Sequence, residues 1–120
     1  DITIKEARNK PEVIELLREN RQLKNKVGGY YIASNDSSVV SYAYQRKYKL
    51  NELDKVFVCP DGFDIDVLGM TKEKFMHNIS DNNIEYYAKE IKRKLLEDKN
   101  WEKYQNRFKD CDDITAIKVL

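Results

Sequence analysis

Cysteine is scarce in this chain of 120 residues, which excludes two classes of small protein. Cys59 and Cys111 are too few for a disulfide-stabilised scaffold, and they lack the CxxC spacing of a zinc site. We therefore expect a reducing, cytoplasmic location. Glycine and proline are also rare, and no segment rich in Pro, Gly and Ser divides the chain. This composition predicts one hydrophobic core, in a single domain or in half of a larger one.

Long hydrophobic runs and an excess of charge of one sign are absent as well. No stretch approaches the roughly 18 apolar residues of a membrane span, and the first residues lack the apolar segment of a signal peptide. We expect a soluble protein without a membrane partner. Lys and Arg total 22 against 21 for Asp and Glu, a net charge of +1. Because that balance provides no field to attract nucleic acid, we interpret the basic stretch "QRKYKL" as a solvated strand face.

The hydrophobic pattern predicts an α+β protein. Apolar residues at helical spacing predict helices at residues 10–25, 71–79 and 82–98. Aromatic and branched residues predict antiparallel strands at residues 30–34, 39–48, 55–60 and 114–120. Residues 56–59 are all apolar, which is typical of a central strand buried on both faces.

Acidic residues adjoin two of these predicted strands. Asp61 and Gly62 come at the end of the central strand, and Asp112 and Asp113 directly precede the last one. Carboxylates on a rigid strand end can bind a hard divalent cation, and glycine lets the backbone approach the ion or its water. Taken alone, each feature is more typical of a simple turn or loop.

Other chemical motifs are excluded. No GxxxxGK[ST] phosphate loop is present, although "VFVCPD" is similar to the strand that carries a magnesium-binding aspartate in such proteins. Asp61, Asp64 and Asp66 do not have the spacing of an EF-hand loop. The only histidine, His77, has no serine or cysteine placed to form a visible nucleophile pair.

Three stretches in order resemble the C-terminal half of the metal-dependent serine/threonine phosphatases of the protein phosphatase 2C family, in its bacterial branch. They are "LLRENRQLKNKVGGYYIASND" (16–36), "VFVCPDGFD" (56–64) and "DDITAIKVL" (112–120). The resemblance spans nearly the whole chain from Leu16. It implies part of an antiparallel β-sandwich flanked by α-helices.

The resemblance also implies a site and a reaction. Asp61 matches a metal-binding aspartate, and Asp112 matches the aspartate of the family's final motif. Gly62 and Asp113 lie beside these ligands, where Asp113 could orient a metal-bound water. In the family, two Mn²⁺ or Mg²⁺ ions activate a water that attacks a phosphoserine or phosphothreonine of a phosphoprotein substrate. No side chain of this chain is therefore expected to act as a catalytic nucleophile, acid or base.

The chain departs from the family pattern in two ways. Pro60 replaces the Thr or Ser that usually precedes the Asp-Gly pair, so the strand end is expected to be shaped differently. The family's N-terminal half, with its phosphate-binding arginine and further metal ligands, has no counterpart before Leu16. We expect this chain alone to be inactive and to associate with the missing half or with itself.

A different class of function stays open at this point. The same strands and helices could form a pseudophosphatase or a non-catalytic interaction module, which binds a partner through an exposed sheet edge. Nucleic-acid binding through the tyrosine- and lysine-rich stretch is the third and weakest hypothesis, and it would show a steep salt dependence of affinity.

Overall fold

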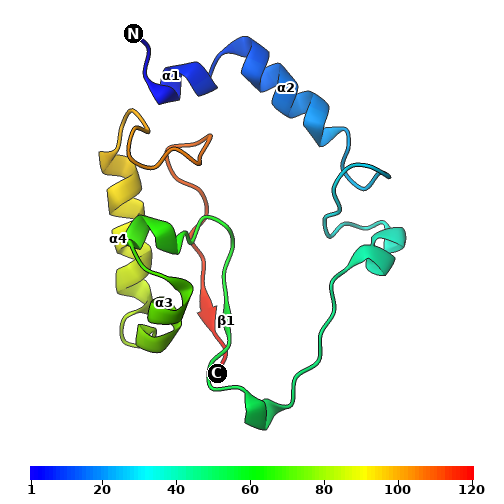
Figure 1. The fold of residues 1–120 in the computed structure, drawn as a ribbon, viewed down its shortest axis with the longest axis vertical. Coiled ribbons are helices and arrows are strands. Elements are labelled where there is room, and N and C mark those ends of the chain that lie inside the picture. Colours follow the sequence, from blue (N-terminus) through cyan, green and yellow to red (C-terminus); the bar gives the residue numbers. More distant parts are fainter. The chain divides into compact units, whose positions relative to one another are not determined.

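The computed structural model describes all residues from 1 to 120 and divides into two compact units (Figure 1). One unit combines residues 1–7 with residues 49–120, and the other comprises residues 8–48. None of the helices is both long enough and apolar enough to cross a lipid bilayer. All of the predicted site residues belong to the unit that contains residues 49–120.

The unit formed by residues 8–48 contains one regular helix, α2 (Pro11–Arg21), which confirms the helix predicted at residues 10–25. Pro11 occupies the first turn, where its missing N–H has no helical partner to lose. No residue of this unit is buried. Its clearest internal contact is the stack of the Tyr31 and Tyr42 rings, whose centroids lie 3.9 Å apart.

The strands predicted at residues 30–34 and 39–48 are wrong. Only an isolated bridge between Lys24 and Tyr30 occurs in the first of them, and a 3-10 helix, η1 (Ser37–Tyr42), begins the second. Aromatic and branched residues favour a strand only where a neighbouring strand and a buried face are present. Neither is present here, so strand propensity alone does not produce a strand.

The unit with residues 49–120 contains the other two predicted helices. Helices at residues 71–79 and 82–98 are confirmed as α3 (Lys72–Asn78) and α4 (Ile84–Glu97). Thr71 caps α3, since its side chain accepts a hydrogen bond from the Lys74 N–H at 3.2 Å. The remaining elements are α1 (Ile4–Arg8), which begins in this unit, η2 (Leu50–Glu52), β1 (Phe57–Val58), η3 (Ile65–Leu68) and β2 (Ile117–Lys118).

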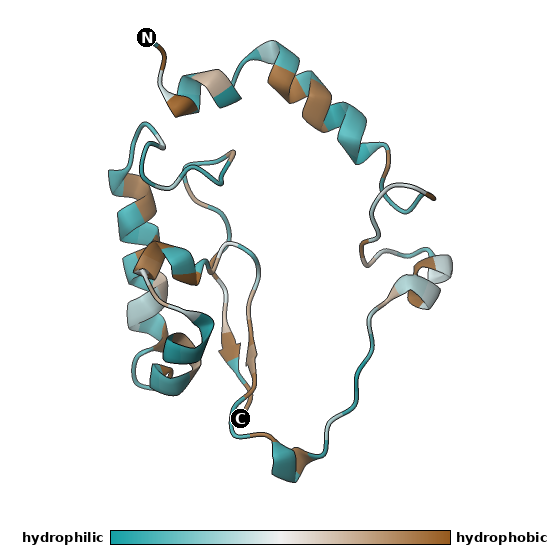
Figure 2. Ribbon diagram, viewed as in Figure 1, coloured by the Kyte–Doolittle hydropathy of each residue, from teal (hydrophilic) through white to brown (hydrophobic).

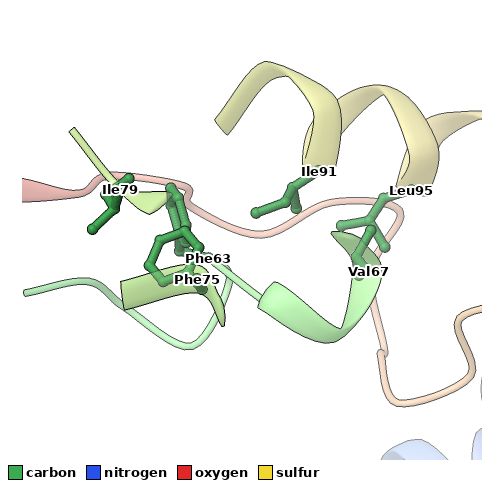
Figure 3. Close-up of a cluster of buried hydrophobic side chains, with 6 residues drawn as sticks. All are labelled: Phe63, Val67, Phe75, Ile79, Ile91 and Leu95. Carbon is green, nitrogen blue, oxygen red and sulfur yellow. The ribbon is translucent and has the colours of Figure 1, made fainter. Parts of the chain in front are cut away.

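The core of this unit lies between α4, α3 and η3. Its buried side chains are Phe63, Val67, Phe75, Ile79, Ile91 and Leu95 (Figure 3). Leu95 of α4 points toward Val67 of η3, so η3, which follows Asp61 by a few residues, packs against the helix. The rings of Phe57, Phe63 and Phe75 meet edge to face, with centroids 5.2 to 5.7 Å apart. The apolar stripe of the predicted helix 82–98 therefore faces this core.

The two strands form a single antiparallel sheet, with Phe57 paired to Lys118 and Val58 to Ile117. Hydrophobic residues occur on both strands (Figure 2), but only one face is covered. Phe57 packs on the core, whereas Val58 is 56% exposed and Ile117 58% exposed. The prediction that residues 56–59 are buried on both faces is thus wrong, because the sheet has no second layer. The predicted sandwich stays a prediction.

Lys55 anchors the start of β1 to the end of α3. Its ammonium group donates hydrogen bonds to the carbonyl oxygens of Met76, His77 and Ile79, at 2.9, 2.8 and 3.1 Å. The last carbonyls of a helix lack intrahelical partners and carry partial negative charge, so a cation there is favourable. This anchor holds the strand that leads to Asp61.

Candidate functional site

The two predicted metal ligands come together at one end of the strand pair. Asp61 follows β1, and Asp112 precedes β2. Because β1 and β2 run antiparallel, the segment that leaves one strand lies beside the segment that enters the other. Both aspartates line the same pocket, whose volume is about 520 Å³. The structure thus places Asp61 and Asp112 beside one pocket, and their role as metal ligands stays a prediction.

The backbone at Gly62 lies very close to the segment that contains Asp112 and Asp113. A Cβ atom at position 62 would lie 2.2 Å from the carbonyl oxygen of Asp113 and 3.1 Å from the Cβ of Asp112. The backbones are therefore too close for any residue other than glycine. Glycine was expected here to admit an ion, and the structure gives it a different role, the contact that brings Asp61 toward Asp112.

Both acidic and basic side chains line the pocket. The acidic ones are Asp61, Asp64, Asp66 and Asp112, and the basic ones are Lys103, Arg107 and Lys109. Sequence reasoning considered Asp64 and Asp66 only as members of an EF-hand and did not assign them to this site. Their closeness to Asp61 in the sequence was the available signal. Asp64 also caps η3, since its side chain accepts a hydrogen bond from the Asp66 N–H at 2.9 Å.

Asp112 is held as a carboxylate by two donors. The Asp113 N–H donates a hydrogen bond of 2.9 Å to Asp112 Oδ1, and Lys109 Nζ lies 3.2 Å from both carboxylate oxygens. The backbone hydrogen bond, and after it the Lys109 ammonium, hold the pKa of Asp112 below its ordinary value. Asp112 is thus a negatively charged oxygen donor at neutral pH.

Asp113 has a different environment from Asp112. Its side-chain Oδ1 accepts a hydrogen bond of 2.9 Å from the Thr115 hydroxyl group, and it is not among the residues that line the pocket. Asp113 therefore contributes to this site through its backbone, by the N–H that it gives to Asp112 and the carbonyl that lies against Gly62.

The carboxylates of the pocket are ligands of the kind that a hard divalent cation prefers, but too few of them gather at one point to hold such an ion. Carboxylate oxygens are the ligands that Mg²⁺ and Mn²⁺ prefer. The ammonium group of Lys109 already forms an ion pair with Asp112. However, no three side chains among His, Cys, Asp and Glu gather closely enough to hold a metal ion. Asp61 and Asp112 can supply two ligands, and a complete metal centre needs others.

The segment that carries the basic lining residues Lys103, Arg107 and Lys109 is organised by Asp98, the residue after α4. Its carboxylate accepts hydrogen bonds from the N–H groups of Glu102, Lys103 and Tyr104, at 3.0, 3.2 and 2.9 Å. It also forms an ion pair of 2.9 Å with Arg107. These contacts fold the chain after α4 back toward the pocket.

Arg107 makes a second set of contacts that hold this segment in place. It donates hydrogen bonds to the carbonyl oxygens of Leu95, Asp98 and Asp110, at 2.7, 2.5 and 2.8 Å. Its guanidinium group lies 5.5 Å from the centroid of the buried Trp101 ring, and Trp101 Nε1 donates a hydrogen bond of 3.0 Å to Asp110. Sequence reasoning missed this network, since no local pattern pairs residues 98 and 107.

The burial and bonding of Asp98 lead to a prediction about acid stability. Burial raises the pKa of Asp98, but the three N–H groups and Arg107 together outweigh it, so the pKa is lower than in the unfolded chain. The stabilisation is therefore present above the unfolded pKa, near 4, and is lost as pH falls through the lower folded value.

We expect the free energy of unfolding to decrease below about pH 4, and to decrease less steeply in Asp98→Asn. Urea unfolding followed by the fluorescence of Trp101, the only tryptophan, measures this. Asp54→Asn, at an exposed aspartate outside the pocket, is the matched control. An unchanged slope in Asp98→Asn would contradict the assignment.

Comparison of this chain with models of known protein families, with curated proteins and with solved structures finds no match. Its function is therefore inferred from the chemistry of the pocket and from the motifs that surround it.

Proposed function

We propose that this chain is the C-terminal portion of a metal-dependent serine/threonine protein phosphatase similar to the bacterial members of the protein phosphatase 2C family. One observation carries the proposal: Asp61 and Asp112, which match the family's metal-binding aspartates, line one pocket although they are far apart in the sequence. The antiparallel pairing of β1 and β2 brings the two aspartates to the end of the strand pair where the resemblance implies a metal site.

In this proposal, Asp61 and Asp112 each supply carboxylate oxygens to a centre of two Mn²⁺ or Mg²⁺ ions. When bound, such ions lower the pKa of a coordinated water so that it attacks the phosphorus of phosphoserine or phosphothreonine. Gly62 keeps the two ligands together, and the Asp113 N–H keeps Asp112 oriented and ionised. The other ligands come from a second part of the phosphatase, which this chain binds as its partner.

A pseudophosphatase or interaction module is the second candidate, and a specific observation favours it. The outer face of the strand pair carries three exposed apolar side chains, Val58, Ile117 and Val119. Exposed apolar groups on a sheet face, together with unpaired strand edges, are typical of a surface that another chain covers. The same surface would serve a phosphatase in which the other half of the domain covers it.

The test removes each ligand in turn. In a protein extended by the missing half, we expect Asp61→Asn and Asp112→Asn each to lower Mn²⁺-dependent hydrolysis of a phosphothreonine peptide by about 100-fold or more, because even groups that only support metal ligands cost 10- to 100-fold. Calorimetric titration with Mn²⁺ should show weakened binding in both variants. Asp54→Asn, outside the pocket, should behave like the unchanged protein.

Two results would contradict the proposal of a phosphatase completed by a second half. An extended protein that binds neither Mn²⁺ nor Mg²⁺ would favour the interaction module. Metal-dependent turnover by the 120-residue chain alone, at the rate of a complete enzyme, would show that no second half is needed. We expect the isolated chain to have no measurable activity, since two carboxylates are too few to hold two ions.

A further inference from the structure

Two stretches of the unit formed by residues 8–48 combine tyrosines with positively charged residues. Residues 21–31 and residues 42–48 together contain five of the chain's eight tyrosines, five Lys or Arg residues and no Asp or Glu. The tyrosines are Tyr30, Tyr31, Tyr42, Tyr44 and Tyr48, and the cations are Arg21, Lys24, Lys26, Arg46 and Lys47. None of these residues lines the pocket, so the proposed phosphatase reaction gives them no role.

The charge of this chain is unevenly distributed between its two units. Residues 8–48 contain eight Lys or Arg and four Asp or Glu residues, a net charge of +4. The other residues contain 14 and 17 of these, a net charge of −3. The total of +1, which made nucleic-acid binding the weakest hypothesis, therefore does not describe the unit 8–48, whose own field attracts a polyanion.

No carboxylate of the chain neutralises the five cations. None of the ion pairs in the structure includes Arg21, Lys24, Lys26, Arg46 or Lys47. The guanidinium group of Arg46 lies instead over the Tyr48 ring, 4.9 Å from its centroid. Because these cations have no acidic partner within the chain, they are available to the phosphate groups of another molecule.

The tyrosine rings are exposed and do not form a core. Their exposed fractions range from 36% at Tyr31 to 86% at Tyr44, and no residue of the unit is buried. The rings of Tyr31 and Tyr42 stack almost in parallel, at 8°, which connects the stretch 21–31 to the stretch 42–48. Exposed aromatic rings next to cations are what proteins use to stack the bases of a single strand.

We propose that the unit formed by residues 8–48 binds a single strand of nucleic acid. The phosphates of the strand pair with the five cations, and its bases stack on exposed tyrosines, with Tyr44 as the most accessible ring. This function is additional to the proposed phosphatase and lies in the unit that does not contain the pocket.

The combination of rings and cations favours a single strand over other polyanions. An acidic protein segment or an anionic membrane would pair with the cations but has no series of bases to stack on the tyrosines. A DNA duplex keeps its bases stacked on each other, so they are not free to contact the rings. Since base faces and phosphates are common to RNA and DNA, we expect both kinds of strand to bind.

The test is a titration of fluorescein-labelled oligothymidine and oligouridine, each of about 12 nucleotides, with the full 120-residue chain. Fluorescence anisotropy measures the affinity. We expect the logarithm of the association constant to fall with the logarithm of salt concentration with a slope of about −3, because five cations each neutralise a phosphate at about 0.7 per contact.

Substitutions at two positions separate stacking from charge. Tyr44→Leu should weaken binding by about 5-fold or more, whereas Tyr44→Phe, which keeps the ring, should bind like the unchanged chain. Tyr86→Leu is the matched control, since Tyr86 is 60% exposed but belongs to the other unit. Lys47→Gln should reduce the salt slope by about 0.7, and Lys92→Gln, at an exposed lysine of the other unit, should leave it unchanged.

Several outcomes would overturn the proposal. They are the absence of binding to both oligonucleotides at about 50 mM salt, and a Tyr44→Leu variant that binds as tightly as the unchanged chain. Equal affinity for heparin, which has charge but no bases, or tighter binding to phosphatidylserine vesicles would do the same. Asp61→Asn and Asp112→Asn should bind the oligonucleotides normally, so failure here leaves the proposed phosphatase untouched, and failure of the phosphatase leaves this proposal standing.

Discussion

Replacing Gly62 with alanine is expected to force the two halves of the candidate site apart. The new Cβ would lie 2.2 Å from the Asp113 carbonyl oxygen, which is backbone and cannot move aside as a flexible side chain would. The Asp61 and Asp112 segments must separate to relieve this overlap. We expect a loss of roughly 3 kcal/mol in the free energy of unfolding, the upper range for overpacking.

Thermal and urea unfolding measure this loss, and Gly69→Ala is the control. Gly69 has a φ of 68°, which disfavours any residue with a Cβ, but a Cβ there would contact nothing within 4 Å. Its replacement should cost only about 1 to 2 kcal/mol, from backbone conformation alone. If Gly62→Ala unfolds like the unchanged chain, the close approach of Gly62 to Asp113 is not a feature of the protein in solution.

Replacing Arg107 with methionine is expected to be the most destabilising change outside the hydrophobic core. The Arg107 side chain is only 10% exposed and its partner carboxylate on Asp98 only 12%. Methionine would leave Asp98 charged, largely buried and without its ion-pair partner, and would leave carbonyl oxygens that now accept from Arg107 without that donor. Breaking a buried pair in this way costs about 3 to 5 kcal/mol.

This loss is a large part of the total stability of a small domain, so we expect a substantial unfolded fraction at room temperature. Circular dichroism and urea titration measure it. Arg93→Met is the matched control: Arg93 pairs with Glu90 and Glu97 on α4 but is 51% exposed, so its loss should destabilise the chain much less. Equal effects of the two substitutions would contradict a structural role for Arg107.

The same substitution has a consequence for the site. Arg107 and Asp98 hold the segment that carries Lys109 and leads to Asp112. Asp98→Asn removes the charge and keeps only one of the two acceptor oxygens, so it is expected to loosen the same segment by another route.

The sequence by itself determined the local elements of this protein. The helices α2, α3 and α4 were predictable because their signals are local: Pro11 in a first turn, Thr71 as a cap, and the apolar stripe of residues 84–95. A helix satisfies its backbone hydrogen bonds within one segment, so neighbouring residues suffice to specify it. The sequence also indicated that Asp61 follows one strand and Asp112 precedes another, although β1 and β2 are shorter than the predicted strands.

Only the tertiary structure decided which strands form and what surrounds the aspartates. A strand needs a partner from elsewhere in the chain, and β1 found one in β2 whereas the tyrosine-rich residues 39–48 found none. The pocket lining, the ion pair of Asp98 with Arg107 and the contact of Gly62 with Asp113 also join residues that no short pattern links. Their energies come from burial and from close approach, which exist only once the chain has folded.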